Sequence, residues 1–515
     1  MADVTISRGR AAVAGILSAA AGLGVAELCA GALGVRQTPV VALGAAFIDV
    51  VPPWLKDLAI SLFGTADKLV LIVGILIVLA VVAGGVGILT ASRRSLGQTV
   101  VVGIGIIAAG VAVTRPDAAV TAGIPGLAAG ISASVLLPIL LRRLGAVEAY
   151  DRDSTRTGPA PRTDRRALVL TGGGVLLGST VLAGLGRWWG ARRLGVEDTR
   201  TTLPVPTGAK APAPPGAELK VDGLGPWRTP NPVFYRIDTA LSEPLVELAD
   251  WRLRIHGMVD RPMTLTFDDL RRRPAVNRWV TLACVSNEVG GSLVGNALWT
   301  GVPIADILRE VGVRERADAL KSTSEDGWTC GTPLSALTDG RDALLAYAMN
   351  GEALPVEHGF PVRMVVPGLY GYVSATKWVV DLEVTRFDRF QAYWTTRGWS
   401  EQAPIKTASR IDVPRQGAVV SAGRVVVAGV AWAQYRGISR VEVRVDGGPW
   451  QQARLAGQPT KDAWRQWTFD WQAPPGEHRL AVRATDGAGA TQTGALAPPA
   501  PNGATGWHSV DVTVE

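Results

Sequence analysis

One cysteine of this chain stands where a thiol could do chemistry. Cys284 ends an apolar, β-rich run that begins at Trp279, and the loop after it is crowded with Gly, Ser and Asn. Strand ends followed by glycine-rich loops let a backbone approach a large ligand closely. A single cysteine at such a place is a candidate metal-bound thiolate or nucleophile. A buried structural cysteine is the alternative, and the spacing alone does not decide between them.

Three segments lie in order along the chain around this cysteine. The first reads Asn-Pro-Val-Phe-Tyr-Arg-Ile-Asp from Asn231, and the second reads Cys-Val-Ser-Asn-Glu-Val-Gly-Gly from Cys284, with Gly-Asn-Ala-Leu-Trp-Thr-Gly-Val-Pro after it. The third reads His-Gly-Phe-Pro-Val-Arg-Met-Val-Val-Pro-Gly-Leu-Tyr-Gly-Tyr-Val-Ser-Ala-Thr-Lys-Trp from His358. Together they resemble the cofactor-binding segments of the sulfite oxidase family of molybdopterin enzymes.

The resemblance implies a molybdenum–molybdopterin cofactor and a set of residues that hold it. Cys284 would be the catalytic residue and the thiolate ligand of the metal. The other contacts would come from Asn231, Phe234, Tyr235, Arg236, Thr323, His358, Arg363, Ser374, Ala375, Thr376 and Lys377. Their chemistry suits the task, because arginine and backbone N–H groups bind phosphate, while an aromatic ring and an amide match a planar pterin. A glycine-rich turn with Ser, Thr and Lys can also cradle an anion.

The resemblance further implies a reaction, the two-electron transfer of an oxygen atom between the metal and a small-molecule substrate. Sulfite-oxidising members carry an arginine in the loop after the cysteine and a tyrosine near the metal. Here that loop carries Glu288 and no arginine, and Trp394 stands at the tyrosine position. Because a carboxylate would repel a sulfite dianion, we expect another substrate, neutral or sulfoxide-like.

Electrons would have to pass to or from a separate partner, because the chain has no Cys-x-x-Cys-His motif for a bound haem. All four histidines lie outside the apolar segments, so no haem is expected in the membrane part either. A different class of function is a non-catalytic binding or scaffold protein with a degenerate cofactor domain. Retention of Cys284, Arg363 and Lys377 together argues against that class, since sequence drift would most easily lose the thiolate.

The composition divides the chain into a membrane part and a water-exposed part. Hydrophobic residues make up 47% of the 515 residues, the mean hydropathy is +0.20, and the apolar content is concentrated before Gly190. The net charge of +7 comes largely from arginines beside apolar segments, so nucleic acid is not an expected partner. The three cysteines do not have the spacing of a zinc site, and a disulfide between Cys284 and Cys330 would consume the proposed ligand.

Five segments are long and apolar enough to cross a lipid bilayer, which takes about 20 helical residues. They are 11–35, 68–91, 97–114, 118–141 and 167–188. The segment 40–63 is broken by two prolines and carries charges, so we expect it to lie at the membrane interface or to re-enter the bilayer. Arginines gather before the first span, between the second and third, and between the fourth and fifth. The positive-inside rule therefore predicts a multi-pass protein of the cell membrane with a cytoplasmic N-terminus and an extracytoplasmic region after the fifth span.

Two polar features of the membrane part each have two interpretations. Arg165 and Arg166, ahead of the fifth span, resemble a twin-arginine export motif, but the topology needs cytoplasmic arginines there in any case. Export of a folded domain would suit a cofactor that is acquired in the cytosol. Glu27, inside the first span, could belong to a proton or ion pathway or, as we favour, make a polar contact between helices.

The predicted architecture is multidomain. An all-α transmembrane bundle occupies 1–189, and a Pro-rich linker occupies 190–230. An α+β molybdopterin domain of the sulfite oxidase type follows at 231–400, with strands expected at 251–259, 360–367 and 377–384 and a helix at 304–311. An all-β immunoglobulin-like sandwich is expected at 401–515, where alternating runs are separated by turn signals. Family members often dimerise through this domain, and the sequence leaves open whether a homodimer forms here.

Overall fold

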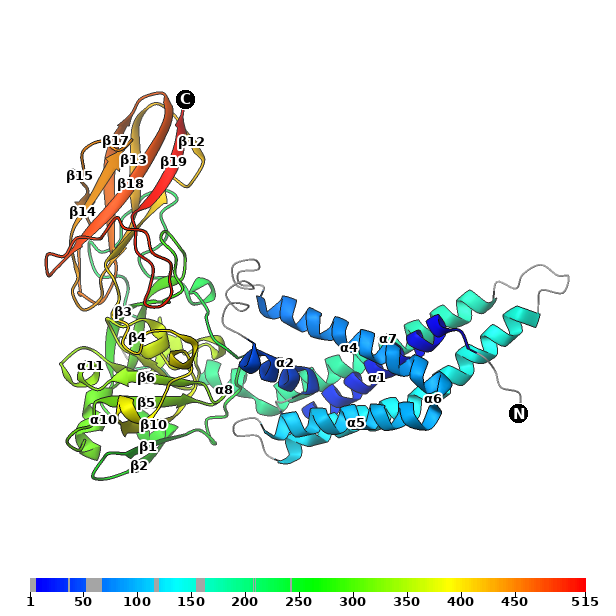
Figure 1. Cartoon of the computed structure of the whole chain (residues 1–515). Coiled ribbons are helices and arrows are strands. Elements are labelled where there is room, and N and C mark those ends of the chain that lie inside the picture. Colours follow the sequence, from blue (N-terminus) through cyan, green and yellow to red (C-terminus); the bar gives the residue numbers. More distant parts are fainter. Residues whose placement is uncertain are drawn as a thin grey trace. The chain divides into compact units, whose positions relative to one another are not determined.

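The computed structural model describes residues 6–35, 38–51, 67–114, 120–153, 163–206, 208, 210–240 and 243–515. The chain forms two compact units. The first joins residues 1–195 to a short segment at 240–244, and the second holds 196–239 and 245–515. The first unit is helical, whereas the second is built mostly from β-sheets (Figure 1).

The helical unit is organised around its first helix. Its helices are α1 (Arg8–Leu33), α2 (Pro39–Val50), α4 (Asp67–Ser92), α5 (Arg94–Val113), α6 (Ile124–Asp153) and α7 (Thr163–Leu194). α1 packs along α4, α6 and α7, while α5 packs on α6. Small residues make the approach close, since a Cβ atom added at Gly31 of α1 would lie 2.0 Å from the carbonyl oxygen of Gly186 in α7. A larger residue at Gly31 would therefore push the two helices apart.

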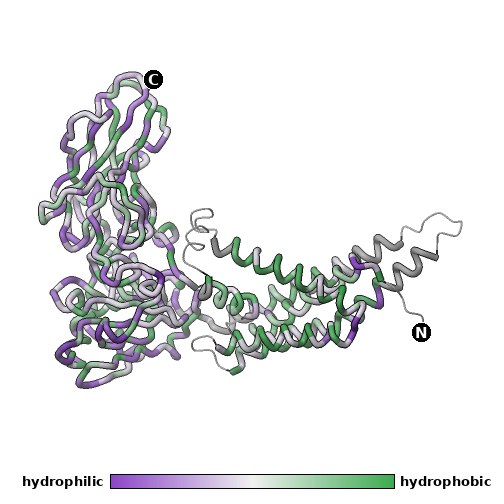
Figure 2. The backbone as a smooth tube through the Cα atoms, in the orientation of Figure 1, coloured by the Kyte–Doolittle hydropathy of each residue, from purple (hydrophilic) through white to green (hydrophobic). Residues whose placement is uncertain are grey.

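Four stretches of this unit have the length and composition to cross a membrane, namely Arg8–Leu33, Val70–Ser92, Arg94–Val113 and Val120–Leu144. They coincide with the first four predicted spans. The predicted fifth span lies within α7, which is not among the four. The helices of this unit are mostly apolar along their length (Figure 2). Some apolar side chains face outward, since Val78 and Val81 of α4 are 62% and 71% exposed. Such faces are compatible with a membrane anchor.

The polar features of the helical unit have different outcomes. The Glu27 carboxylate of α1 lies 3.5 Å from Nε of Arg187 in α7, so Glu27 makes the favoured contact between helices. The segment 40–63 begins as α2, and its two prolines with Lys56 and Asp57 lie outside the described residues. The side chains of Arg165 and Arg166 also lie outside the description, and the export motif stays a prediction.

Two sheets form the α+β part of the second unit. One has the strand order β2–β1–β10–β5–β6, in which β1 and β10 are parallel, and the other has the order β3–β4–β7–β8, with β9 paired to β7. The strands are β1 (Arg252–Gly257), β2 (Met263–Thr266), β3 (Val276–Ala283), β4 (Val294–Pro303), β5 (Ala319–Ser324), β6 (Thr329–Pro333), β7 (Leu344–Met349), β8 (Glu352–Ala353), β9 (Arg363–Val365) and β10 (Val379–Thr385). The short helices are α8 (Val196–Thr202), α9 (Phe267–Arg271), α10 (Ile304–Val311) and α11 (Ser335–Thr338).

Local sequence signals explain several of these elements. The predicted helix 304–311 is α10, and its apolar residues face the core. α9 begins with a capping box, because the Thr266 hydroxyl accepts from the N–H of Asp269 at 3.1 Å and the Asp269 carboxylate accepts from the N–H of Thr266 at 3.0 Å. The strand predicted at 360–367 is shorter, since β9 covers only Arg363–Val365. Prolines at both ends of the predicted run cannot donate to a strand ladder.

The C-terminal part of the second unit is an all-β sandwich, as predicted. Its strands are β11 (Ala408–Val413), β12 (Ala418–Val420), β13 (Gly423–Trp432), β14 (Ile438–Val445), β15 (Gln451–Gln452), β16 (Arg454–Leu455), β17 (Arg465–Ala473), β18 (Gly476–Asp486) and β19 (His508–Val514). The two sheets have the orders β11–β13–β17–β16 and β12–β19–β18–β14–β15. Buried side chains such as Val427, Val441 and Trp467 fill one core between them.

Candidate functional site

A pocket of about 900 Å³, counted with the solvent at its mouth, lies in the α+β part of the second unit. It collects residues from all three predicted segments, although these are far apart in the sequence. The predicted residues that line it are Phe234, Tyr235, Cys284, His358, Arg363, Ala375 and Lys377. The predicted residues that do not line it are Asn231, Arg236, Thr323, Ser374 and Thr376.

Cys284 reaches the pocket because the β3–β4 hairpin ends beside it. The strands pair as far as Ala283 and Val294, and the N–H of Cys284 donates to the carbonyl of Leu293 at 2.9 Å. Cys284 is 9% exposed, and burial raises the pKa of its thiol. Hydrogen bonds from the N–H and hydroxyl of Ser286 and from the N–H of Val285 lower that pKa and favour the thiolate. A bound metal would complete the deprotonation.

Arg363, at the start of β9, is a cation buried in this pocket. Its guanidinium donates to the carbonyls of His358, Ala375 and Met364 at 3.0, 3.4 and 3.4 Å, and it lies 4.9 Å from the ring centre of Trp299. Burial lowers the pKa of Arg363 to about 10. Within the described part of the chain no carboxylate pairs with it. A desolvated cation without a counter-charge fits an anionic group of a bound ligand.

His358 and Lys377 line the same pocket as Arg363, and hydrogen bonds hold both side chains in place. Nε2 of His358 lies 2.9 Å from the carbonyl oxygen of Asn231, so the imidazole donates and its proton is on Nε2. Burial and the nearby positive charges lower the pKa of His358 to about 4, which keeps the ring neutral near pH 7. The Lys377 ammonium pairs with Asp238 at 2.5 Å and donates to the carbonyl of Glu357 at 3.0 Å.

Ser324 lines the pocket, whereas its neighbour Thr323, a predicted cofactor residue, does not. Both residues end β5, where successive side chains point to opposite faces. Ser324 is 2% exposed and lines the pocket, and its hydroxyl has no hydrogen-bond partner among the residues that the structure describes. Thr323 is half-buried and pairs with Asp381 and Thr329 in the sheet. An orphaned buried hydroxyl in a pocket is a further sign that a polar ligand belongs there.

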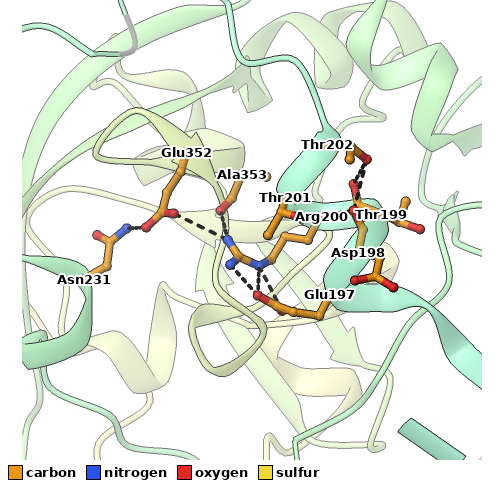
Figure 3. A network of polar contacts seen from close by, with 9 residues as sticks. All are labelled: Glu197, Asp198, Thr199, Arg200, Thr201, Thr202, Asn231, Glu352 and Ala353. Atoms are coloured by element: carbon orange, nitrogen blue, oxygen red, sulfur yellow. Dashed lines mark hydrogen bonds and ion pairs between the residues drawn. The ribbon is translucent and has the colours of Figure 1, made fainter. Parts of the chain in front are cut away.

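The amide of Asn231 is occupied by the protein rather than turned into the pocket. Its Nδ2 donates to Glu352 at 2.5 Å, and its Oδ1 accepts from Asn350 at 2.7 Å. Glu352 in turn lies 3.6 Å from Arg200 of α8, which also donates to the carbonyl of Ala353 at 3.1 Å (Figure 3). This network fixes Asn231, whose carbonyl holds His358 at the pocket wall.

The loop that contains Ser374 and Thr376 is shaped by these two hydroxyls. The Ser374 hydroxyl donates to the carbonyls of Leu369 and Tyr370 at 3.1 and 2.9 Å. The Thr376 hydroxyl bonds to that of Ser322 at 2.7 Å. Both side chains therefore hold the turn that presents Ala375 to the pocket. Arg236 is exposed, and its charge is close enough to His358 to lower the pKa of that imidazole.

Aromatic side chains make up much of the remaining wall. Trp394, which the family resemblance predicts at the position of a tyrosine, lines the pocket together with Trp399. Burial raises the pKa of Tyr235, and so does the negative charge that Cys284 carries as a thiolate, so this phenol keeps its proton. Tyr372 and Trp328, which are not among the predicted cofactor residues, also line the pocket. Tyr372 lies within the third predicted segment, whereas Trp328 lies outside all three and reaches this wall only through the fold.

Cys284 is the pocket side chain that the sequence predicts as the metal ligand. Among the described residues no group of three or more His, Cys, Asp and Glu side chains is arranged to hold a metal ion. A metal bound to Cys284 would therefore take its other ligands from a bound organic group. This donor set, with a buried cation and an orphaned hydroxyl nearby, fits a metal carried by an anionic cofactor.

Comparison with known proteins agrees with this chemistry. Residues 240–394 match the model of the oxidoreductase molybdopterin binding domain, and residues 408–482 match that of a bacterial Ig domain. An uncharacterised oxidoreductase of Bacillus subtilis, YuiH, is 36% identical over 171 residues, which cover 33% of this chain and 81% of YuiH. The mitochondrial sulfite oxidase of Mus musculus is 31% identical over 337 residues, which cover 56% of this chain. The chain belongs to the sulfite oxidase family of molybdopterin oxidoreductases.

Membership of this family accounts for the α+β domain and for the strand-rich domain after it. The matched region spans 60% of the length of the mouse sulfite oxidase. Among solved structures, the crystal structure of the sulfane dehydrogenase SoxCD from Paracoccus pantotrophus is 25% identical, with a TM-score of 0.49, over 62% of this chain and 91% of that one. The helical unit lies outside both matching family models.

Proposed function

We propose that the protein is a membrane-anchored molybdopterin oxidoreductase that transfers an oxygen atom at a molybdenum bound to Cys284. The observation that carries this proposal is the meeting of Cys284, the uncompensated cation of Arg363 and the orphaned hydroxyl of Ser324 in one pocket. When bound, the molybdenum cofactor supplies two-electron chemistry and oxygen-atom transfer at the metal. The residues of the chain bind it, orient it and shape the space for the substrate.

The chain's own residues divide this work. Hydrogen bonds from Ser286 and Val285 partly offset the burial that raises the pKa of Cys284, and the bound metal would stabilise its thiolate. Arg363 and Lys377, with Arg236 at the exposed edge, form the cationic side that binds the cofactor phosphate. The other predicted cofactor residues either line the cofactor pocket or support its wall in this proposal. They are Asn231, Phe234, Tyr235, Thr323, His358, Ser374, Ala375 and Thr376. Ser324 joins them as a hydrogen-bond donor to the cofactor.

The substrate that we propose is neutral or sulfoxide-like rather than sulfite. Glu288 does not line the pocket of Cys284 but a second cavity, which is lined by other residues of the same loop and by Lys406, Arg436 and Asp486. Arg436 is paired with Asp486 at 2.8 Å, and Lys406 donates to the carbonyl of Gly503 at 2.5 Å. The charges of these four side chains cancel, so this cavity has no excess of positive charge to attract a dianion.

The position of the enzyme in the cell is part of the same proposal. The helical unit anchors the protein in the cell membrane with its N-terminus in the cytoplasm, and the molybdopterin and Ig-like domains lie outside. This orientation is supported by the arginines between the apolar segments. Electrons pass to or from a separate partner protein, and the Ig-like domain provides the surface for a homodimer.

Turnover assays on the purified full-length protein in detergent test this proposal. We expect reduction of dimethyl sulfoxide or methionine sulfoxide with a reduced viologen dye, and little oxidation of sulfite with ferricyanide. Glu288→Gln is the matched variant, because it removes the charge with little change of shape, and it should gain sulfite binding. Robust sulfite oxidation by the wild type would contradict the proposed substrate class.

A further inference from the structure

The loop that follows Cys284 is held from outside its own domain. This loop runs from Cys284 to Leu293 between β3 and β4, and it has internal bonds, since the Asn287 side chain accepts from the N–H of Leu293 at 2.7 Å. Its outer turn, Gly290 and Gly291, contacts the C-terminal sandwich instead. Two residues of that sandwich, Arg410 in β11 and His508 in β19, make these contacts.

Arg410 fixes the carbonyl side of this turn. Its Nη1 donates to the carbonyl oxygen of Gly291 at 2.7 Å, while its Nε pairs with Asp412 at 2.5 Å. The side chains of Arg410 and Asp412 are both only 17% exposed. A guanidinium held by a carboxylate at one edge has a fixed direction for the hydrogen bond at the other edge. The turn therefore meets a rigid donor rather than a mobile surface side chain.

His508 fixes the other side of the turn by close packing. Gly290 has φ +78°, and a Cβ atom added there would lie 2.1 Å from Cδ2 of the imidazole. The ring is itself held, because the backbone N–H of Ile411 donates to its Nδ1 at 3.0 Å. The proton of the neutral ring is therefore on Nε2. Only glycine meets both the positive φ and the contact with this ring.

We propose that Arg410 and His508 of the Ig-like domain are positioning residues for the metal-binding thiolate, because together they set the place of the Cys284 loop. The inference rests on the proposed role of Cys284 as the molybdenum ligand. It gives the Ig-like domain a part in the chemistry besides any part in dimerisation. Neither residue touches the proposed reacting atoms, so both act through the loop.

The first test measures the reactivity of the thiol in the cofactor-free chain. Full-length protein from cells that cannot make the cofactor is alkylated with iodoacetamide, and mass spectrometry follows Cys284 and Cys330 separately. Loss of one hydrogen bond to the loop should speed the labelling of Cys284 about fivefold in Arg410→Gln. Gly290→Ala should give a similar increase from the loop side. Arg424→Gln, which breaks an exposed ion pair with Asp470 in the same sandwich, is the matched control and should not change the rate.

The second test reads the metal in the loaded enzyme. Arg410→Gln and Gly290→Ala should shift the Mo(V) electron paramagnetic resonance signal, and removal of the ring in Gly290→Ala/His508→Ala should bring the signal back toward that of the wild type. An unchanged labelling rate and an unchanged signal in both single variants would overturn the inference. An equal increase in the labelling rate of the fully buried Cys330 would also overturn it, because it would indicate general loosening of the protein. If Arg410→Gln does not fold, Gly290→Ala and its double variant decide alone. A wild type that lacks molybdenum would contradict the proposed function, while the labelling would still test the contact.

Discussion

Arg363→Met should leave the cofactor-free protein as stable as the wild type or slightly more stable, but it should weaken cofactor binding. Burial lowers the pKa of Arg363 from 12.5 to about 10, which corresponds to roughly 3 kcal/mol of unfavourable charge burial in the empty pocket. Methionine has a similar length and no charge, but it gives up three hydrogen bonds to carbonyls, two of them long at 3.4 Å. The two effects nearly cancel, so the cofactor-free variant should be as stable as the wild type or more stable by about 1 kcal/mol.

Cofactor retention should fall in the same variant. A charge-assisted hydrogen bond to a phosphate contributes about 1.5–3 kcal/mol, so the cofactor should dissociate about 10- to 150-fold more readily. Denaturant unfolding of the cofactor-free chain, followed by tryptophan fluorescence, measures the first quantity. Pterin content after gel filtration measures the second. Arg424→Met, at a cation that is 68% exposed in its ion pair with Asp470, is the control and should change neither. A variant that is destabilised by more than about 2 kcal/mol and still keeps its cofactor would refute this reasoning.

Three further predictions follow from the same geometry. Ser324→Ala should stabilise the cofactor-free protein by about 1 kcal/mol, because it removes an unpaired buried hydroxyl. It should also weaken cofactor retention about fivefold, whereas Thr323→Ala should leave retention unchanged in the same pterin assay. The pKa of His358 is about 4 in the folded protein, below its ordinary value of 6.5, so the unfolded chain takes up a proton at a higher pH than the folded one. The free energy of unfolding should therefore be at its full value above pH 6.5 and fall by up to roughly 3 kcal/mol toward pH 4. His358→Gln should flatten this pH dependence in denaturant titrations at several pH values. Gly31→Leu should separate α1 from α7, because Gly186 leaves no room for a side chain, and should lower the thermal midpoint of the helical unit in detergent, whereas Gly74→Leu, where nothing lies within 4 Å, should not.

Local patterns predicted the elements that place the thiol. The apolar run from Trp279 is β3, and the glycine-rich loop after it is the hairpin loop that begins at Cys284. The capped start of α9 and the helix 304–311 follow equally local signals. The family resemblance then predicted site residues that are far apart along the chain but close together in the folded protein. Seven of the predicted site residues line one pocket, which no periodicity could have indicated.

What the sequence could not predict depends on geometry that sequence does not express. Thr323 and Ser324 are neighbours with similar side chains, and only the face of β5 tells which one is turned to the pocket. The side-chain amide of Asn231 bonds to Glu352 and Asn350 within the protein, and no local pattern predicts these partners. The contact of His508 with Gly290 joins positions more than 200 residues apart, so no local pattern predicts it. Such contacts depend on how domains pack.

The central claim is that Cys284 binds molybdenum carried by a pterin cofactor. The most direct measurement is metal and pterin analysis together with molybdenum-edge X-ray absorption, on purified full-length wild type beside Cys284→Ser. We expect about one molybdenum for each chain in the wild type, and one fewer molybdenum–sulfur contact in the variant, with pterin still bound through Arg363 and its neighbours. A wild type with neither molybdenum nor pterin, or a variant with an unchanged number of sulfur contacts, would contradict the account.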